Sequence, residues 1–414
     1  MLFKLALLSL KDRKNSVLLS VLAMTVSIVV LIGIEHIRQQ TKANFANTIS
    51  GVDLIVGART SSMNLLLYSV FRIGNPTNNI RWDTYQAIAN SKQVKWAIPI
   101  SLGDSHKGFR VMGTTPEYFD FFSYGQKHGL TFKTGARFNH VFDVVLGANV
   151  ANQLGYRLGD KITLAHGIGA TSFSHHSANP FTVSGILART GTPVDQTLHV
   201  SLQSIEAIHS SGPQTVQLSE ALSLKDVQDD PSLQPKTITA FMVGLQSKMA
   251  IFQFQRRVNE YASEPIVAIL PGVALSELWQ MMGMLENTLL LISVLVFIAA
   301  SFGVSAMLLA SIRERRHEIN LLRMIGAPAY FLFLLIQVEA LLITLLSCGL
   351  GLSLLSTCLW LFGDELVSQF GLNIDANLLT LNTLYVTMAT MIASVLIAII
   401  PSLTGYRHAK QLNN

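Results

Sequence analysis

Four long apolar stretches constrain this chain more than any other feature of its sequence. They run over residues 15–34, 287–312, 328–362 and 376–406, and the only charged residue in any of them is Glu339. A helix needs about 20 apolar residues to cross the hydrocarbon core of a bilayer. Half of the 414 residues are hydrophobic and only 13% are charged, which excludes a disordered chain and argues strongly against a soluble one. We predict a membrane α-helical protein with four transmembrane helices.

The first stretch differs from a cleaved signal peptide in its length and in its C-terminal flank. A signal peptide has a short apolar core and a cleavage site flanked by small residues. Residues 15–34 are longer than such a core, and residues 35–38 read as a helix that continues into water. We therefore expect a retained membrane anchor.

Basic residues near the ends of the stretches predict the orientation of the chain, because cytoplasmic loops carry an excess of Lys and Arg. Ten of them fall in three segments, which the rule places in the cytoplasm: Lys4, Lys11, Arg13, Lys14, Arg313, Arg315, Arg316, Arg323, Arg407 and Lys410. The large segment between the first two stretches and the loop at 363–375 then face the periplasm. We expect a multi-pass protein of the bacterial inner membrane with both termini cytoplasmic. The net charge of +5 gives no reason to expect a nucleic-acid partner.

The segment between the first two stretches, residues 38–283, has the composition of an aqueous domain. It holds 20 of the 30 basic and 16 of the 25 acidic residues. Sequence periodicity predicts strands at 107–112, 141–146, 161–164, 181–187 and 198–200. It predicts helices at 83–91, 149–155 and 201–210, with Asn149 and Ser201 as N-caps. We predict an α+β domain of two subdomains, the middle one (about residues 120–230) inserted into the first.

These patterns predict a complete division of the chain. In chain order it has an amphipathic cytoplasmic helix at 1–14, a transmembrane helix at 15–37, the periplasmic domain at 38–283, a transmembrane helix at 284–312, a cytoplasmic helix at 313–327, a transmembrane helix at 328–362, a periplasmic loop at 363–375, a transmembrane helix at 376–406 and a cytoplasmic tail at 407–414.

The predicted spans contain few ionisable residues. Glu339 lies inside the third, and Glu35 and Glu286 lie at the exported ends of the first and second. Carriers that move ions or polar solutes along their helices usually show several such residues facing a cavity. Glu339 fits either a polar contact between helices or a lone proton site, and we favour the contact. Small residues in the second and third spans would allow the helices to approach each other closely: Ser301, Gly303, Ser305, Gly349, Gly351 and Ser353.

The cytoplasmic segment 313–327 is the most informative part of the sequence. Its apolar residues recur every three positions behind a cluster of charges, and Gly326 and Pro328 end the pattern, so we predict a short amphipathic helix. One reading is a helix that rests on the lipid surface. The other is a coupling helix that docks into a groove of a partner ATPase. In that reading the coupling residues are Arg313, Glu314, Arg315, Arg316, Glu318, Ile319, Leu322, Arg323 and Gly326.

This segment resembles the signature ERRxEIxxLRxIGA of the MacB/FtsX-type permeases, the ABC transporter family that includes the lipoprotein-releasing LolC and LolE subunits. Further resemblance lies at residues 2–14, 144–147, 159–162, 181–186, 265–290 and 401–407. The resemblance covers essentially the whole chain. It implies four transmembrane helices, a MacB-like periplasmic core domain, a second permease copy and a separate ATP-binding subunit.

The chain itself lacks the phosphate-binding motif G-x-x-x-x-G-K-[ST]. We therefore expect ATP and magnesium to bind the partner subunit, and we expect no cofactor in this chain. No nucleophile elbow or paired-carboxylate pattern stands out, so we expect no enzymatic activity. MacB itself carries its ATPase in the same chain, so macrolide export is not implied.

Three histidines bracket a loop in the predicted periplasmic domain: His166, His175 and His176. Imidazoles this close in sequence bind zinc if the loop folds back on itself. Neighbouring side chains in a strand point to opposite faces, however, so His175 and His176 could both ligate only from irregular backbone. A solvated polar loop is the reading we prefer.

The resulting hypothesis is a permease that passes ATP-driven motion to its periplasmic domain and handles its substrate on that side of the membrane, with a periplasmic adaptor or lipoprotein as a further candidate partner. Two alternatives stay open. One is FtsX-like signalling to a periplasmic partner, against which the large domain argues, and the other is a zinc-linked transport component. The identity of the substrate and the direction of transport do not follow from the fold.

Overall fold

The computed structural model of the protein describes residues 2–46, 48–166, 180–210, 222–227, 230–314, 328–370 and 377–411. The chain divides into two compact units. The first, a helical unit, comprises Met1–Gln40, Met282–Asp364 and Ile374–Asn414. The second, an α/β unit, comprises Thr41–Met281 and Glu365–Asn373.

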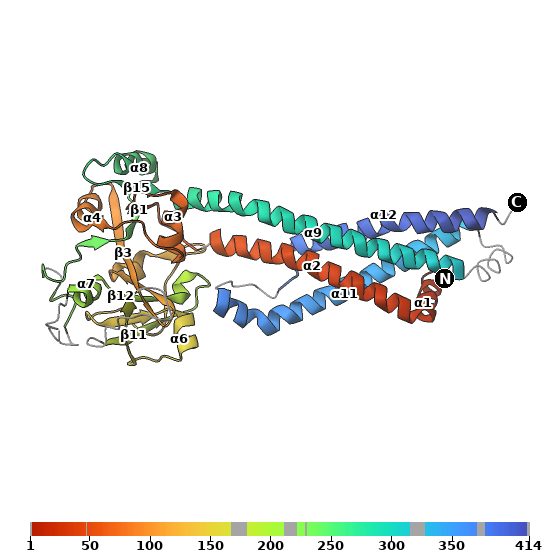
Figure 1. Ribbon diagram of the computed structural model, residues 1–414, viewed down its shortest axis with the longest axis horizontal. Helices are drawn as coiled ribbons and strands as arrows, with labels where there is room; N and C mark the ends of the chain where they lie inside the picture. Colours follow the sequence, from red (N-terminus) through yellow and green to blue (C-terminus); the bar gives the residue numbers. More distant parts are fainter. Residues whose placement is uncertain are drawn as a thin grey trace. The chain divides into compact units, whose positions relative to one another are not determined.

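The helical unit contains four helices that are long and apolar enough to cross a membrane (Figure 1). They are α2 (Lys14–Ala46), α9 (Pro271–Glu314), α11 (Ala329–Phe370) and α12 (Leu381–Gln411). The short helix α1 (Leu2–Asp12) precedes them. The prediction of four transmembrane helices is confirmed.

These helices extend beyond the apolar stretches of the sequence. α9 begins at Pro271, where proline suits the first helical position because its missing N–H has no partner there in any case. α12 keeps Pro401 inside its last turns. Hydropathy marks only the part of a helix that lies in lipid, so it underestimates helices that continue into polar surroundings.

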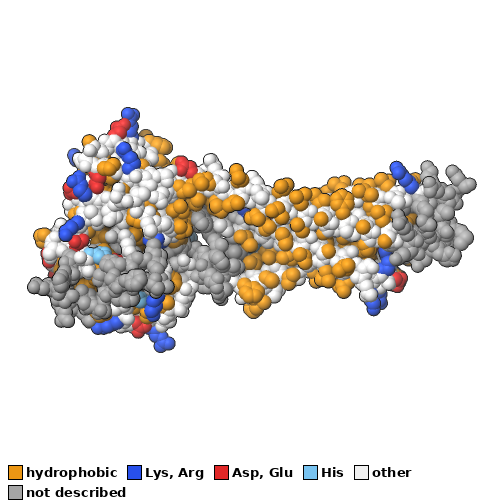
Figure 2. All heavy atoms as spheres, viewed as in Figure 1, with side chains coloured by type: hydrophobic (Ala, Val, Ile, Leu, Met, Phe, Trp, Pro, Cys, Tyr) orange, Lys and Arg blue, Asp and Glu red, His pale blue; other side chains and the backbone are white. Residues whose placement is uncertain are grey.

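One apolar cluster holds the helical unit together. It draws on all five helices, through buried residues such as Ala6 of α1, Val21 of α2, Leu308 of α9, Ile336 of α11 and Ala398 of α12. The outward faces remain apolar, and Figure 2 shows hydrophobic side chains along the helices. Serine and threonine side chains such as Ser301, Thr344 and Ser347 are buried alongside this cluster, as is typical of helices packed in lipid.

The α/β unit is built on one mixed sheet of 11 strands. The strand order is β15-β1-β14-β3-β4-β12-β8-β11-β7, with β10 paired to β3 and β9 to β11. The bounds are β1 Leu54–Ala58, β3 Val94–His106, β4 Phe109–Thr114, β7 Phe132–Gly135, β8 Asp143–Leu146, β9 Lys161–Ile162, β10 Ala165–His166, β11 Phe181–Leu187, β12 Thr197–Ser201, β14 Ala240–Leu245 and β15 Ile266–Ile269. Two small sheets pair β13 (Thr237–Ile238) with β2 (Ile80–Arg81) and β5 (Ser123–Tyr124) with β6 (His128–Gly129).

Short helices accompany the sheet. They are α3 (Ser62–Leu66), α4 (Trp82–Ala89), α5 (Glu117–Phe121), α6 (Ala148–Leu154), α7 (Leu202–Ser210) and α8 (Ile251–Asn259), and single turns form η1 (Leu67–Phe71), η2 (Pro193–Gln196) and η3 (Lys248–Ala250). The structure thus confirms a mixed α/β domain between the first and second long helices.

The predicted local elements have counterparts in the structure, with ends that differ by a few residues. The strand predicted at 141–146 is β8, which begins at Asp143, and the one predicted at 161–164 is β9, which ends at Ile162. The strand predicted at 107–112 begins two residues later, because Lys107 and Gly108 take positive φ in the tight turn between β3 and β4. Ser201 caps α7 as predicted, since its Oγ accepts a hydrogen bond from the Ser204 N–H at 3.0 Å. The prediction that Asn149 caps α6 is wrong, because the N-cap is Gly147.

Apart from the small β5–β6 hairpin, the described strands between residues 120 and 230 belong to the same sheet as those outside that range. β12 pairs parallel to β4, and β4 pairs with the 13-residue strand β3, which also pairs with β14. The inserted stretch therefore extends the first sheet instead of building another, and β3 and β4 connect the two halves.

Candidate functional site

The predicted coupling segment lies largely outside the described residues. Arg313 and Glu314 form the end of α9, and the next described residue is Pro328, just before α11. The remaining coupling candidates fall in the stretch 315–327, which is not described: Arg315, Arg316, Glu318, Ile319, Leu322, Arg323 and Gly326. The coupling helix stays a prediction.

Glu339, the intramembrane carboxylate, lies in a polar cluster that joins α1, the α1–α2 turn and α11. Its Oε2 is 3.4 Å from Nη2 of Arg13, which sits in the turn between α1 and α2. Its Oε1 accepts a hydrogen bond from Ser9 of α1, and the same Arg13 nitrogen donates to Ser9 Oγ at 2.9 Å. The Glu339 side chain is only 3% exposed. The contact between helices that we favoured from the sequence is present, and a role in proton transfer stays untested.

This Ser9–Arg13–Glu339 cluster fixes how the N-terminal helix meets the bundle. A carboxylate and a guanidinium that are both buried need each other, because either one alone in an apolar environment is costly. The Nε and Nη1 atoms of Arg13 are buried without a hydrogen-bond partner in the described part of the chain. The ion pair therefore attaches the α1–α2 turn to α11 and leaves spare donors on the arginine.

A second polar cluster lies at the opposite end of the bundle. Arg38 of α2 forms a bidentate pair with Glu35, at 2.7 and 2.9 Å, and its Nη1 is 3.6 Å from Glu286 of α9. Gln39 donates to Glu35 and accepts from Asn382 of α12 at 2.9 Å. The Glu35–Arg38–Glu286 cluster thus joins three of the four long helices where residues 35 and 286 were expected to end the spans.

Between these clusters the long helices meet through small and hydroxyl-bearing residues. A Cβ on Gly351 of α11 would lie 3.2 Å from Cγ2 of Ile28 in α2, a tight contact that the glycine avoids. Thr344 of α11 hydrogen-bonds Ser394 of α12. A Cβ on Gly303 or Gly349 would meet no described atom within 4 Å, so these two glycines do not mark a close contact within the described part of the chain.

The structure describes only part of the predicted histidine cluster. His166 belongs to β10, where its backbone pairs with Asp104 of β3. His175 and His176 lie outside the described residues. Within the described ranges, no group of three or more His, Cys, Asp or Glu residues is placed to hold a metal ion. Zinc binding at the loop stays a prediction.

A different histidine in the α/β unit makes an ion pair that sequence reasoning missed. Nε2 of His209, in α7, lies 3.5 Å from Oδ1 of Asp104, a carboxylate that is 2% exposed. The hydrogen bond with Asp104 raises the pKa of His209 above its usual value. Nearby His106 contacts the Thr163 carbonyl and the Tyr156 hydroxyl, and burial lowers its pKa.

The partners of Glu339 were not predicted from the sequence. Arg13 was expected only to mark the cytoplasmic side, and no role was expected for Ser9. These residues precede Glu339 by more than 320 positions, so no local pattern connects them. The available signal was the single charge in an otherwise apolar span, which requires a partner of opposite sign.

The fold and these clusters define a class: a multi-pass membrane protein whose first two spans flank a large mixed α/β domain. Within this class, residues 17–260 match the family "MacB-like periplasmic core domain" and residues 290–409 match "FtsX-like permease C-terminal". Because the first match alone covers more than half of the chain, the protein belongs to the MacB/FtsX family of ABC-type permeases. It therefore has a periplasmic or extracellular domain, and its class works with an ATPase subunit. Neither match is to a catalytic domain.

Two solved structures are similar to part of the chain. The periplasmic region of MacB from Actinobacillus actinomycetemcomitans is 12% identical, with 56% of this chain and 94% of that one covered and a TM-score of 0.34. The extracellular domain of the noncanonic ABC-type transporter YknZ from Gram-positive bacteria is 11% identical, with 53% and 99% covered and a TM-score of 0.32. No curated protein matches the chain. The family assignment rests on the two sequence matches.

Proposed function

We propose that this permease receives the motion of a separate ATPase at residues 313–327 and transmits it through its helices to the periplasmic domain, which moves the substrate. It works as a pair of permease subunits, identical or related. Both termini lie in the cytoplasm.

The distribution of charge in the helical unit carries this proposal. Between the Ser9–Arg13–Glu339 cluster and the Glu35–Arg38–Glu286 cluster, the described parts of the four long helices contain no Asp, Glu, Lys, Arg or His. The charges at both ends bind one helix to another, so they are used for assembly and do not line a route across the bilayer. Transport along the helices requires such a route. A bundle without one is better suited to transmitting movement.

Binding of the ATPase tests the coupling segment. Leu322 lies on the apolar side of the predicted amphipathic helix, so Leu322→Glu places a charge in the docking face. We expect the co-expressed ATPase to be lost from the purified complex and its stimulated ATP hydrolysis to fall to the basal rate. The control is Asn320→Glu, a change at a polar position of the same helix, which retains the ATPase. Retention of the ATPase by Leu322→Glu contradicts the proposal.

Glu339→Gln separates mechanical transmission from ion coupling. Glutamine can keep the hydrogen bond with Ser9 and removes the titratable proton, but it also removes the counter-ion of Arg13, so assembly of the complex is verified first. In reconstituted complexes we expect the variant and the unaltered protein to hydrolyse ATP at the same rate. We also expect a proton gradient to affect both rates equally. A complex that assembles normally, yet loses a response to the gradient that the unaltered complex shows, supports ion coupling instead.

A further inference from the structure

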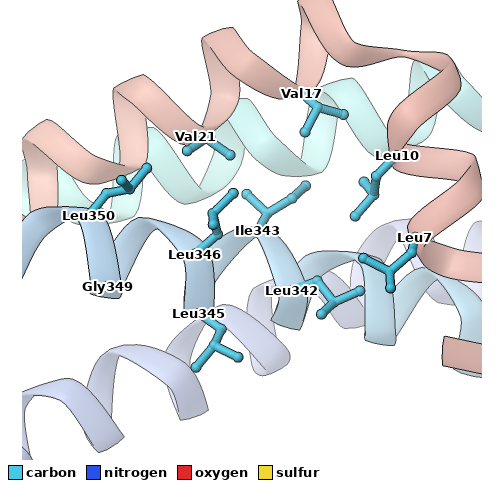
Figure 3. A pocket seen from close by; sticks show the side chains of 10 residues that line it. All are labelled: Leu7, Leu10, Val17, Val21, Leu342, Ile343, Leu345, Leu346, Gly349 and Leu350. Atoms are coloured by element: carbon cyan, nitrogen blue, oxygen red, sulfur yellow. The ribbon is translucent and has the colours of Figure 1, made fainter. Parts of the chain in front are cut away.

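An apolar groove opens on the helical unit between α1, α2 and α11 (Figure 3). Its volume is about 490 Å³. Ten residues line it: Leu7, Leu10, Val17, Val21, Leu342, Ile343, Leu345, Leu346, Gly349 and Leu350. Apart from the glycine, every lining side chain is aliphatic. Such a surface offers dispersion contacts and no hydrogen bond, which suits a hydrocarbon chain and excludes a polar ligand.

The helix that forms one wall of the groove is amphipathic and basic. α1 places Leu7 and Leu10 in the groove, while Lys4 and Lys11 on the same helix are exposed. Lys14, the first residue of α2, is exposed as well. Among the described residues, no ion pair involves any of these three lysines, whereas Arg13 pairs with Glu339. Their ammonium groups are therefore accessible to an anionic ligand outside the protein.

The position of the groove defines that ligand. The excess of Lys and Arg predicts that this end of the bundle faces the cytoplasm, and a basic amphipathic helix at such a boundary lies in the headgroup region of the bilayer. Anionic lipids are attracted to Lys and Arg clusters at this surface. We propose that the groove binds an acyl chain of an anionic glycerophospholipid, whose phosphate lies among Lys4, Lys11 and Lys14. The lipid fills the space between α1 and α11 that the Ser9–Arg13–Glu339 cluster does not occupy.

Gly349 provides a test that leaves the protein packing intact. A Cβ at this position meets nothing within 4 Å, so Gly349→Leu extends into the groove and competes with the acyl chain. Gly303→Leu is the matched control, since Gly303 also has open space around it and does not line the groove. The full chain is purified in mild detergent, and the lipids that remain bound are identified by native mass spectrometry.

We expect the unaltered protein and Gly303→Leu to retain phosphatidylglycerol in excess of its share in the source membrane, and Gly349→Leu to lose it. Lys11→Gln with Lys14→Gln is expected to abolish the excess over phosphatidylethanolamine. Equal retention in Gly349→Leu and Gly303→Leu overturns the proposal. So does a headgroup ratio equal to that of the membrane, or a change of Gly349→Leu from dimer to monomer, which assigns the groove to a second copy of the chain. None of these measurements requires the ATPase, so failure here is distinct from failure of the proposed function.

Discussion

At the scale of the residue, the pair Arg13–Glu339 carries the most consequence for stability. Both side chains are largely buried, at 14% and 3% exposed, in a unit surrounded by lipid. Removing one member leaves the other as an uncompensated charge, whereas removing both leaves only a small space.

Glu339→Ala is therefore expected to lower the free energy of unfolding by about 3–5 kcal/mol. Ser9→Ala, which removes the two hydrogen bonds of the Ser9 hydroxyl and leaves the ion pair, is expected to cost about 1–3 kcal/mol. Unfolding of the full chain in detergent measures both. The double variant Arg13→Ala with Glu339→Ala is expected to lose less than the two single losses added together, and simple additivity would show that the two side chains do not interact.

The raised pKa of His209 predicts how the stability of the α/β unit varies with pH. Its pKa is raised by Asp104, so its stabilising contribution is complete below the unfolded pKa of about 6.5 and is lost as the pH rises through the higher folded value. His106 acts with the opposite sign, because its pKa is lowered. The effect of His209 on stability must therefore be measured with a variant that leaves His106 unchanged.

His209→Gln is expected to lower the unfolding temperature more at pH 5.5 than at pH 8.5. The change is followed by tryptophan fluorescence, because three of the four tryptophans, Trp82, Trp96 and Trp279, belong to this unit. His128→Gln alters an exposed histidine of the same unit and serves as the control. An equal drop in unfolding temperature at both pH values would mean that the ion pair between His209 and Asp104 does not contribute to the pH dependence.

At the scale of the element, the contact of α2 with α11 depends on one missing side chain. Gly351→Leu would bring new atoms against Ile28, and crowding of this kind typically costs about 1–3 kcal/mol. We expect a lower unfolding temperature in detergent, with partial recovery when Ile28→Ala is added. Gly303→Leu, in open space, is expected to have little effect. If Gly351→Leu is as stable as the unaltered protein, the helices do not pack here as described.

The alternation of buried and half-buried positions made β11 predictable from the sequence. In β11, the burial alternates residue by residue, and its predicted bounds, 181–187, are those observed. The strands β1 and β14 are buried at every position, so their apolar runs carry no periodicity of two. β3 contains Pro99, which sequence rules place at sheet edges, yet it pairs on both sides. Its Pro99 carbonyl accepts from Thr114 Oγ1 at 2.8 Å.

The candidate sites were less predictable than the elements for a physical reason. Composition and hydropathy identify Glu339 as unusual, because a buried charge in a span stands out against its neighbours. They do not identify Arg13 or Asn382 as partners of distant residues, because tertiary packing alone brings them together. Local patterns therefore locate the residue that needs a partner, and the fold supplies the partner.

At the scale of the whole molecule, the orientation of the chain can be checked by labelling. Neither natural cysteine is disulfide-bonded, so Cys348→Ala with Cys358→Ala provides a background without thiols. A cysteine at Lys410 is expected to resist a membrane-impermeant maleimide in intact spheroplasts, whereas one at Lys236 in the α/β unit is expected to react. Labelling of the first and protection of the second would reverse the orientation.

Pro401, inside α12, has a consequence for how that helix bends. A proline has no N–H, so the backbone ladder loses one hydrogen bond at this residue, and its ring crowds the preceding turn. The hydroxyls of Ser402 and Thr404 bond to the carbonyls of Ala398 and Ile400, and such hydroxyl bonds also favour curvature. We therefore expect α12 to bend more easily in its final turns than along the rest of the helix.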